Sequence, residues 1–399
     1  MAIHLDCLGN PVTLEDPASL PFVDDFTEGF IASEARALNV LQIAEVDGSP
    51  IVQTLCAALH MFAENAQARC RASPFMARAR SAGHLFHLHR RETRLIAAIG
   101  AWIEGDIDQA ILLHREQVRE FPRDLVSVKL GQYHCFNRGD LKGMLAMALP
   151  AQVPAYEVPY IHGMVAWGWE ETHQLAEAER SASRAIAMRK KEPWAHHALA
   201  HVLLTQGRLG EGYLFMQDMA ATWTGLNSFM LTHNWWHQAL FALEIDRAGE
   251  ALDLYDHQVW GVDKSYSQDQ VNAVSLLSRI EMAGVPAETL HARWQELASH
   301  LSSRIQDQVL PFLDLHYLYG LARAGRPEAD ALLANLTRLA KASANPVWAD
   351  LALPLAHGVI AHAQGQTAQA CRHIRPMLPR LQGIGGSHAQ RDWFEKMAA

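Results

Sequence analysis

Apolar residues recur three and four positions apart through most of the chain, and stretches of strict apolar–polar alternation do not stand out. The first spacing places apolar side chains on one face of an α-helix, whereas alternation would indicate a half-buried strand. Between about residues 30 and 89 the pattern is Ala-rich and helical, with breaks expected at Gly48-Ser49-Pro50 and at Ser73-Pro74. We therefore predict an all-α chain whose residues 1–30 form an arm.

A longer period runs through the middle of the chain. A turn residue recurs every 34 positions, and a second series follows it five positions later. The first series is Gly105, Gly139, His173 and Gly207, and the second is Ala110, Met144, Ala178, Gly212 and, after a slightly longer step, Ala251. This period is that of the tetratricopeptide helix–turn–helix, in which glycine takes the turn conformation and a small residue lets two helices cross closely. The sequence predicts a tetratricopeptide-like α-solenoid, a superhelix of antiparallel helix pairs with turns at the first series.

The repeat pattern divides the chain into three regions. Residues 1–89 would form the arm and helices that pack on the solenoid, and residues 90–260 the tetratricopeptide-like repeats. Residues 261–399 would continue the solenoid as degenerate helical hairpins, with turns at Gly325-Arg326-Pro327 and Gly365. Stacked repeats form a concave groove, which is where such proteins usually bind their ligands.

The charge of the chain narrows the classes of partner. A formal net charge of −9 over 399 residues argues against a general nucleic-acid binder. A local exception lies between residues 69 and 94, where seven arginines are accompanied by one acid, Glu92. A solvated basic helix face is the simpler interpretation, and a rim that attracts anions is the alternative.

The cysteines and the apolar stretches indicate the cellular location of the protein. The five cysteines are scattered without a CxxC motif, which favours reduced thiols and a cytoplasmic protein. The first residues lack a basic segment followed by an apolar core, so we expect no secretory signal. The most apolar stretch, residues 144–169, contains Pro150, Pro154, Pro159 and Glu157, so we expect no membrane span.

Two pairs of histidines carry the main chemical signal. His197 and His201 are four residues apart, as are His233 and His237, so each pair shares one helix face. Because the pairs fall in the first helices of successive repeats, we expect them to meet in one pocket on the concave side, with Trp236 in its wall. Four imidazoles would suit zinc or a similar divalent metal.

Other residues extend or weaken this interpretation. A carboxylate from Asp314 or Glu171 would complete a metal site, and we include Asn234, Asp314 and His316 among the ligand-binding residues. Asp314 and His316 point about 200° apart on a helix, so we do not expect them to act as a dyad. Neither histidine pair encloses a glutamate, so the HExxH motif is absent. The alternative is that the histidines only pack, with hydrogen-bond partners inside the core.

A second motif lies near the end of the chain. Gly385-Gly386 would end one helix, Ser387 would cap the next, and Gln390 would complete a capping box. The same geometry aims free backbone N–H groups at an anion, with Arg391 one turn further along. We predict that Arg391 reaches the histidine pocket and binds an anionic group; the alternative is that it pairs with a nearby acid for stability.

Several strings outside the general repeat pattern resemble those of the tetratricopeptide repeat protein 38 family and its bacterial members. They are Arg91-Glu92, Trp194 with His197 and His201, His233-Asn234 with Trp236-His237, Tyr255-Asp256, Asp314 with His316, and Gly385-Gly386-Ser387 with Ala389-Gln390-Arg391-Asp392. The resemblance runs from about Arg90 to the C-terminus. It implies a helical-repeat fold and groups these residues together, but it implies no reaction.

Three functions fit these observations. We favour a binding protein whose His- and Trp-lined concave pocket holds a small polar or anionic molecule or a peptide. The first alternative is a hydrolase-type enzyme that uses the histidines for acid–base or metal-assisted chemistry. The second is a protein-interaction scaffold. We expect no nucleic-acid or membrane partner, and self-association into a homo-oligomer stays open.

Overall fold

The computed structural model describes residues 2–83 and 88–399, and helices make up most of them. The helical prediction is therefore confirmed. The α-helices are α1 (Leu20–Ala32), α2 (Pro50–Met61), α3 (Ala68–Gly83), α4 (Arg90–Glu104), α5 (Ile107–Glu120), α6 (Leu125–Asn137), α7 (Leu141–Ala148), α8 (Pro159–Glu171), α9 (Leu175–Met188), α10 (Pro193–Thr205), α11 (Leu209–Ala220), α12 (Ser228–Glu244), α13 (Ala248–Leu254), α14 (Ser267–Met282), α15 (Ala287–Leu301), α16 (Pro311–Arg323), α17 (Glu328–Ala342), α18 (Leu353–Ala363), α19 (Thr367–Ile374) and α20 (His388–Met397).

The turns expected from the 34-residue period lie between helices that pack in pairs, from α4–α5 to α10–α11. All four turn residues are left-handed, with φ of 87° at Gly105, 69° at Gly139, 57° at His173 and 68° at Gly207. The residues five positions later are buried. Helical hairpins continue after residue 260, where Gly325 and Gly365 are also left-handed.

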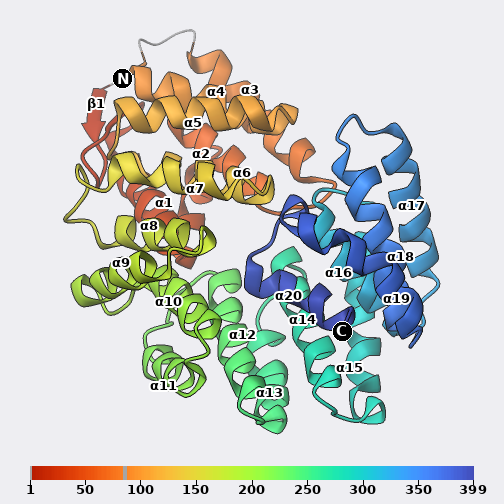
Figure 1. Cartoon of the computed structure of the whole chain (residues 1–399). Helices are drawn as coiled ribbons and strands as arrows, with labels where there is room; N and C mark the ends of the chain where they lie inside the picture. Colours follow the sequence, from red (N-terminus) through yellow and green to blue (C-terminus); the bar gives the residue numbers. More distant parts are fainter. Residues whose placement is uncertain (1, 84–87) are drawn as a thin grey trace.

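Figure 1 shows the helix pairs following one another around an arc, with the C-terminal helix α20 turned back toward the middle. Hydrogen bonds fix α20 there. Arg279 of α14 donates to the carbonyl of Ala389 at 3.0 Å, and Lys396 pairs with Glu244 of α12 at 3.1 Å. This return places residues from the end of the chain beside helices of its middle.

The two ends of the arc also meet. The backbone N–H of Ala66, in the loop between α2 and α3, donates to Asp307 at 2.9 Å. Gln268 of α14 donates to the buried carboxyl group of Glu64 at 2.6 Å. The segment around Glu64 and Ala66 therefore contacts residues more than 200 positions away in the sequence.

One part of the all-α prediction was wrong. Strands β1 (Ala2–Leu5) and β2 (Pro11–Leu14) form an antiparallel hairpin, so residues 1–30 are not a simple arm. Val12 and Leu14 are fully buried, while the backbone N–H and hydroxyl of Thr13 both donate to Glu92. Only four residues alternate in each strand, which is too short a pattern to stand out from a helical sequence.

The break expected at Ser73-Pro74 is also absent, because Pro74 lies inside α3. Ala72, Met76 and Ala79 form one buried face of this helix, and α3 packs along α2. That burial outweighs the local preference of proline for a helix end. The second half of the predicted stretch to residue 89 includes residues 84–87, which lie outside the described residues.

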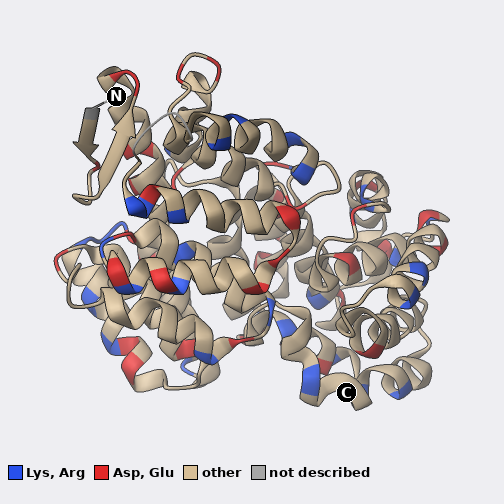
Figure 2. Cartoon of the chain, turned by 90° about the horizontal axis from the view of Figure 1, so that it is seen from above, with Lys and Arg blue, Asp and Glu red and all other residues tan. Residues whose placement is uncertain are grey.

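Several arginines of the arginine-rich segment form ion pairs. Arg91 is buried and pairs with Asp124 at 2.9 Å, so the solvated-face interpretation is wrong for this residue. Arg80 pairs with Glu104 and Arg94 with Glu120. Figure 2 shows basic and acidic residues interspersed along the helices in that view.

The most apolar stretch is interrupted between α7 and α8. Among the described helices, none is both long and apolar enough to cross a bilayer. The five cysteines, all within the described part of the chain, are free thiols.

Candidate metal centre

Two adjacent helices position the four predicted histidines. His197 and His201 lie on α10, which begins at Pro193 after the N-cap Glu192, and His233 and His237 lie on α12, whose N-cap is Asn227. The two helices pack against each other with these faces in contact. Each of the four side chains is at most 3% exposed. The i,i+4 spacing and the repeat period together therefore bring all four rings into one buried place.

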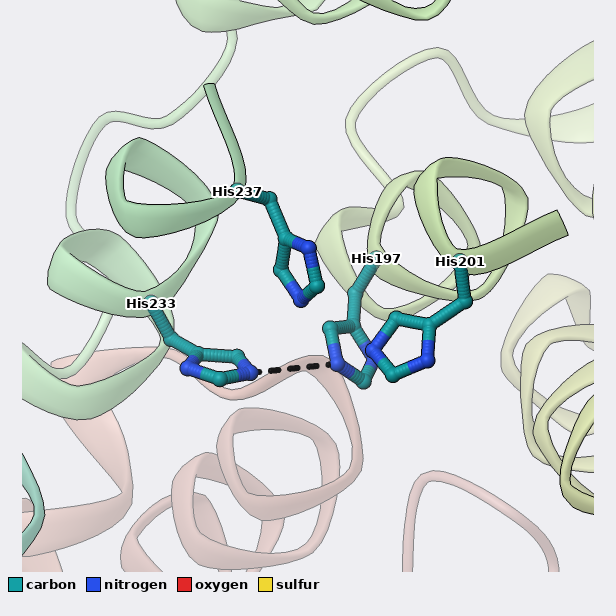
Figure 3. A group of neighbouring side chains, drawn as sticks. All are labelled: His197, His201, His233 and His237. Atoms are coloured by element: carbon teal, nitrogen blue, oxygen red, sulfur yellow. Dashed lines mark hydrogen bonds between the residues drawn. The ribbon is translucent and has the colours of Figure 1, made fainter. Parts of the chain in front are cut away.

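The four rings meet closely (Figure 3). One ligand atom from each histidine can be chosen so that all four lie within 4.8 Å of one another. Nε2 of His233 lies 3.2 Å from Nε2 of His197. Nitrogens bound tetrahedrally to zinc at about 2.0–2.1 Å are about 3.4 Å apart. The side chains thus need to move inward by about 1 Å or less to bind a metal ion.

Burial sets the protonation of the cluster. It lowers the pKa of His201 and of His233 to about 3, and it lowers the pKa of His197 and His237 well below the usual value. Neighbouring histidines depress the pKa values of His197 and His237 further because two imidazolium ions would repel each other. The rings are therefore neutral, which is the form that binds metal ions.

Most nitrogens of the cluster have no hydrogen-bond partner among the described residues. Both ring nitrogens of His201 and of His237 are buried and unpaired, as is Nδ1 of His197. A buried polar atom without a partner costs about 1–3 kcal/mol. His233 differs, because its Nδ1 lies 2.9 Å from Oδ1 of Asn272, which can only accept. This bond fixes the tautomer and leaves Nε2 of His233 with a free lone pair, as in the second shell of metal sites.

Trp236 forms one wall of the cluster. Its indole is fully buried, stacks on His233 with 7° between the ring planes, and meets His237 edge to face at 4.8 Å. The guanidinium of Arg279, on α14, lies 5.6 Å from the centre of the Trp236 ring. Asn234 lies outside the cluster, because its amide donates to the carbonyl of Pro193 at 3.3 Å and ties α12 to the start of α10.

A second group of ligand-type residues adjoins the first. Glu170 and Glu171 at the end of α8, His201, and His388 at the start of α20 offer ligand atoms that also lie within 4.8 Å of one another. Oε2 of Glu170 is 3.3 Å from Nδ1 of His201, and Oε1 of the same residue is 3.0 Å from Nδ1 of His388. His201 therefore belongs to both groups.

Burial again dominates the electrostatics of this second group. It raises the pKa of Glu170 and of Glu171 well above the usual range, with the Glu170 charge adding to the effect at Glu171. Burial lowers the pKa of His388 to about 2. Apart from the close approaches of His201 and His388 to Glu170, the carboxyl oxygens make few contacts with donors among the described residues. Nearby cationic charge would favour ionised carboxylates, and the structure provides one cation in Arg391.

Arg391 reaches the second group rather than the four histidines. Its guanidinium is largely buried, lies 3.9 Å from Glu171, and donates to the carbonyl of Gly386. The capping box is present: Ser387 Oγ accepts from the N–H of Gln390 at 3.2 Å, and the Gln390 side chain accepts from Ser387 N–H. This placement beside a buried acid fits the alternative that Arg391 pairs with an acid for stability. It also leaves the guanidinium beside the residues of the second group.

Asp314 and His316 belong to neither group of ligand residues found in residues 2–83 and 88–399. Both are buried on α16, but Nδ1 of His316 donates to the carbonyl of Phe312 at 2.7 Å and its ring stacks on Trp393. Burial raises the pKa of Asp314 well above normal, and the nearby charge of Asp307 adds to this. Of the two carboxylates named from the sequence, Asp314 therefore lies away from the histidines, whereas Glu171 lies beside Glu170 in the second group.

The sequence analysis did not identify Glu170 and His388 as neighbours of the histidine cluster. The available signal was weak: two consecutive glutamates end an otherwise apolar helix, and a histidine follows the Gly-Gly-Ser turn.

Two surface cavities, of about 610 and 420 Å³, lie away from both groups of ligand-type residues. One lies between α14, α16 and α18, and the other lies beside α15. No protein-family model matches the chain.

Proposed function

We propose that this chain is a tetratricopeptide-like helical-repeat protein that binds a divalent transition-metal ion through His197, His201, His233 and His237. One observation carries the proposal: four neutral, buried imidazoles direct nitrogens at a common point, and most of those nitrogens have no other partner. Packing alone favours apolar residues or histidines with satisfied hydrogen bonds. A single metal ion would satisfy one nitrogen from each ring at once.

The donor set favours particular metals. Four imidazole nitrogens without thiolate suit zinc, copper or nickel, whereas calcium and magnesium prefer oxygen ligands. The Asn272 contact supports a site of this kind because it orients His233 from behind. The complete burial of the four rings favours a metal ion over a larger organic molecule, so the metal takes the place of the small ligand expected from the sequence.

A second candidate function is metal-assisted hydrolysis of a small polar or anionic substrate. The observation that favours it is the adjoining Glu170–Glu171 pair with Arg391, where buried carboxyls with raised pKa values lie next to a histidine of the cluster. Such carboxyls can serve as general acid or base. We also propose, from the sequence, that the protein resembles the repeat family named above, lies in the cytoplasm and has no nucleic-acid partner.

Metal analysis of protein purified without a histidine tag tests the proposal. The wild type and His134→Gln, which alters an equally buried histidine outside the cluster, should retain the metal after dialysis against a mild chelator. His237→Gln should lose it and should weaken the binding of added zinc by more than the roughly 10–100-fold that loss of a second-shell partner costs. Equal zinc binding by all three proteins, or no zinc-dependent rise in the melting temperature of the apo wild type, would overturn the proposal.

A further inference from the structure

The group formed by Glu170, Glu171, His201 and His388 lies against the four-histidine cluster, and one side chain is common to both. We infer that the protein holds a second divalent metal ion at this group. We infer also that His201 releases its remaining ring N–H proton to solvent as the ions bind, and bridges them as an imidazolate through its two ring nitrogens. The inference rests on the proposed function, since a bridge needs an ion in the first site.

The orientation of His201 carries the bridge. Its Nδ1 faces Glu170 at 3.3 Å. In Figure 3 its other ring nitrogen lies on the side of His197, within the four-histidine cluster. The side chain is fully buried, and its second ring nitrogen has no hydrogen-bond partner among the described residues. Two metal ions bound to opposite nitrogens of one imidazole are about 6 Å apart.

The carboxyl groups of the second site are buried as well. The side chains of Glu170 and Glu171 are 0% exposed, and Glu170 lies 3.3 Å from His201 and 3.0 Å from His388. This is unusual for carboxyl groups, which are rarely buried unless they are paired or coordinate a metal. Two carboxylates and two imidazoles suit zinc, iron or manganese.

A hydrogen bond orients His388 toward the same second site. Its Nε2 lies 2.8 Å from the hydroxyl of Thr205 at the end of α10, and this contact orients the ring with Nδ1 toward Glu170. A hydrogen bond to the far nitrogen is the usual support of a metal-binding histidine. The return of α20 toward the middle of the arc, visible in Figure 1, is what delivers this fourth ligand.

The two sites differ in access to solvent. The side chain of His388 is 22% exposed, whereas the four histidines of the first cluster are at most 3% exposed. Arg391 lies 3.9 Å from Glu171, so a cationic donor stands beside the second ion. The second group is therefore the one nearer to solvent, through His388.

Cobalt(II) is the probe that tests this inference. Apo protein loaded with cobalt should bind about two ions per chain, and the electron paramagnetic resonance spectrum should show magnetic coupling across the imidazole bridge. Glu171→Gln and His388→Gln should each lower the content to about one ion and abolish the coupling. Glu64→Gln, which changes a buried carboxyl outside both groups, should retain two coupled ions.

The outcomes separate this inference from the proposed function. One ion in the wild type that is lost in His237→Gln and kept in Glu171→Gln would overturn the second site and leave the first. One ion kept in His237→Gln and lost in Glu171→Gln would overturn the four-histidine site and the bridge with it. Two uncoupled ions would refute the bridging role of His201. The wild-type coupling gives a result even where a variant fails to fold.

Discussion

Replacing Gly212 by alanine tests the close helix crossing on which the repeat depends. Gly212 lies inside α11, at the fourth member of the series that begins with Ala110. A Cβ added there would lie 2.2 Å from Cε1 and 2.3 Å from Cζ of Phe241 on α12. Ordinary carbon contacts are about 3.5–4.0 Å, so the fully buried Phe241 ring would have to move by more than about 1 Å.

The expected magnitude follows from two opposing effects. Overpacking a dense core costs about 1–3 kcal/mol, and a ring with no free space places this case near 3 kcal/mol. Replacing glycine by alanine inside a helix gains about 1 kcal/mol. The free energy of unfolding should therefore fall by about 2 kcal/mol, which corresponds to a melting temperature lower by about 2 °C for a chain of this length that unfolds as one unit.

Gly210→Ala provides the matched control. Gly210 lies two residues away on the same helix, is exposed, and has nothing within 4 Å of an added Cβ. This variant should gain up to about 1 kcal/mol. Urea unfolding followed by circular dichroism measures both variants. In a Phe241→Leu background the penalty of Gly212→Ala should shrink by at least about 1 kcal/mol, since the obstructing ring atoms are gone. Equal stability of the two alanine variants would refute the reasoning.

Two further predictions concern buried polar groups. Burial lowers the pKa of His114 from 6.5 to about 4, so its stabilising contribution is complete above pH 6.5 and is lost as the pH falls through about 4. In His114→Gln the loss of unfolding free energy between pH 6.5 and pH 4 should be smaller by about 3 kcal/mol. Urea unfolding at these two pH values measures the loss, and an unchanged pH dependence would contradict this prediction. Asp124→Ala should cost about 3–5 kcal/mol because it leaves the buried Arg91 unpaired, whereas Asp140→Ala, which removes a similar but exposed N-cap, should cost about 1 kcal/mol. Similar losses in the two alanine variants would show that the Arg91 pair contributes little.

Local sequence signals were sufficient for the helical hairpins. A left-handed turn needs glycine or a tolerant residue, and a close crossing needs a small one, so both leave a mark at fixed spacing. The same argument placed His197 and His201 on one helix face and His233 and His237 on the next, because the repeat period relates the two helices. Proximity of these four rings was therefore readable from the chain alone.

Local signals failed where packing overrode them. Pro74 predicts a helix end, yet α3 continues because one face of it is buried against α2. The β1–β2 hairpin is held by Glu92, almost 80 residues later, whose carboxylate accepts two hydrogen bonds from Thr13. A short strand with such a distant partner has no periodic signature of its own.

The sequence by itself determined the helix pairs and the pairing of the histidines, since both depend on interactions within one or two repeats. Only the tertiary structure decided that α20 folds back and brings His388 and Arg391 to Glu170 and Glu171, more than 200 residues earlier. It also decided that Asp314 and His316 lie apart from the histidines. The physical reason is that the position of a returning helix is set by the summed packing and hydrogen bonds of many residues, such as Arg279 to Ala389, and no fixed spacing along the chain records that sum.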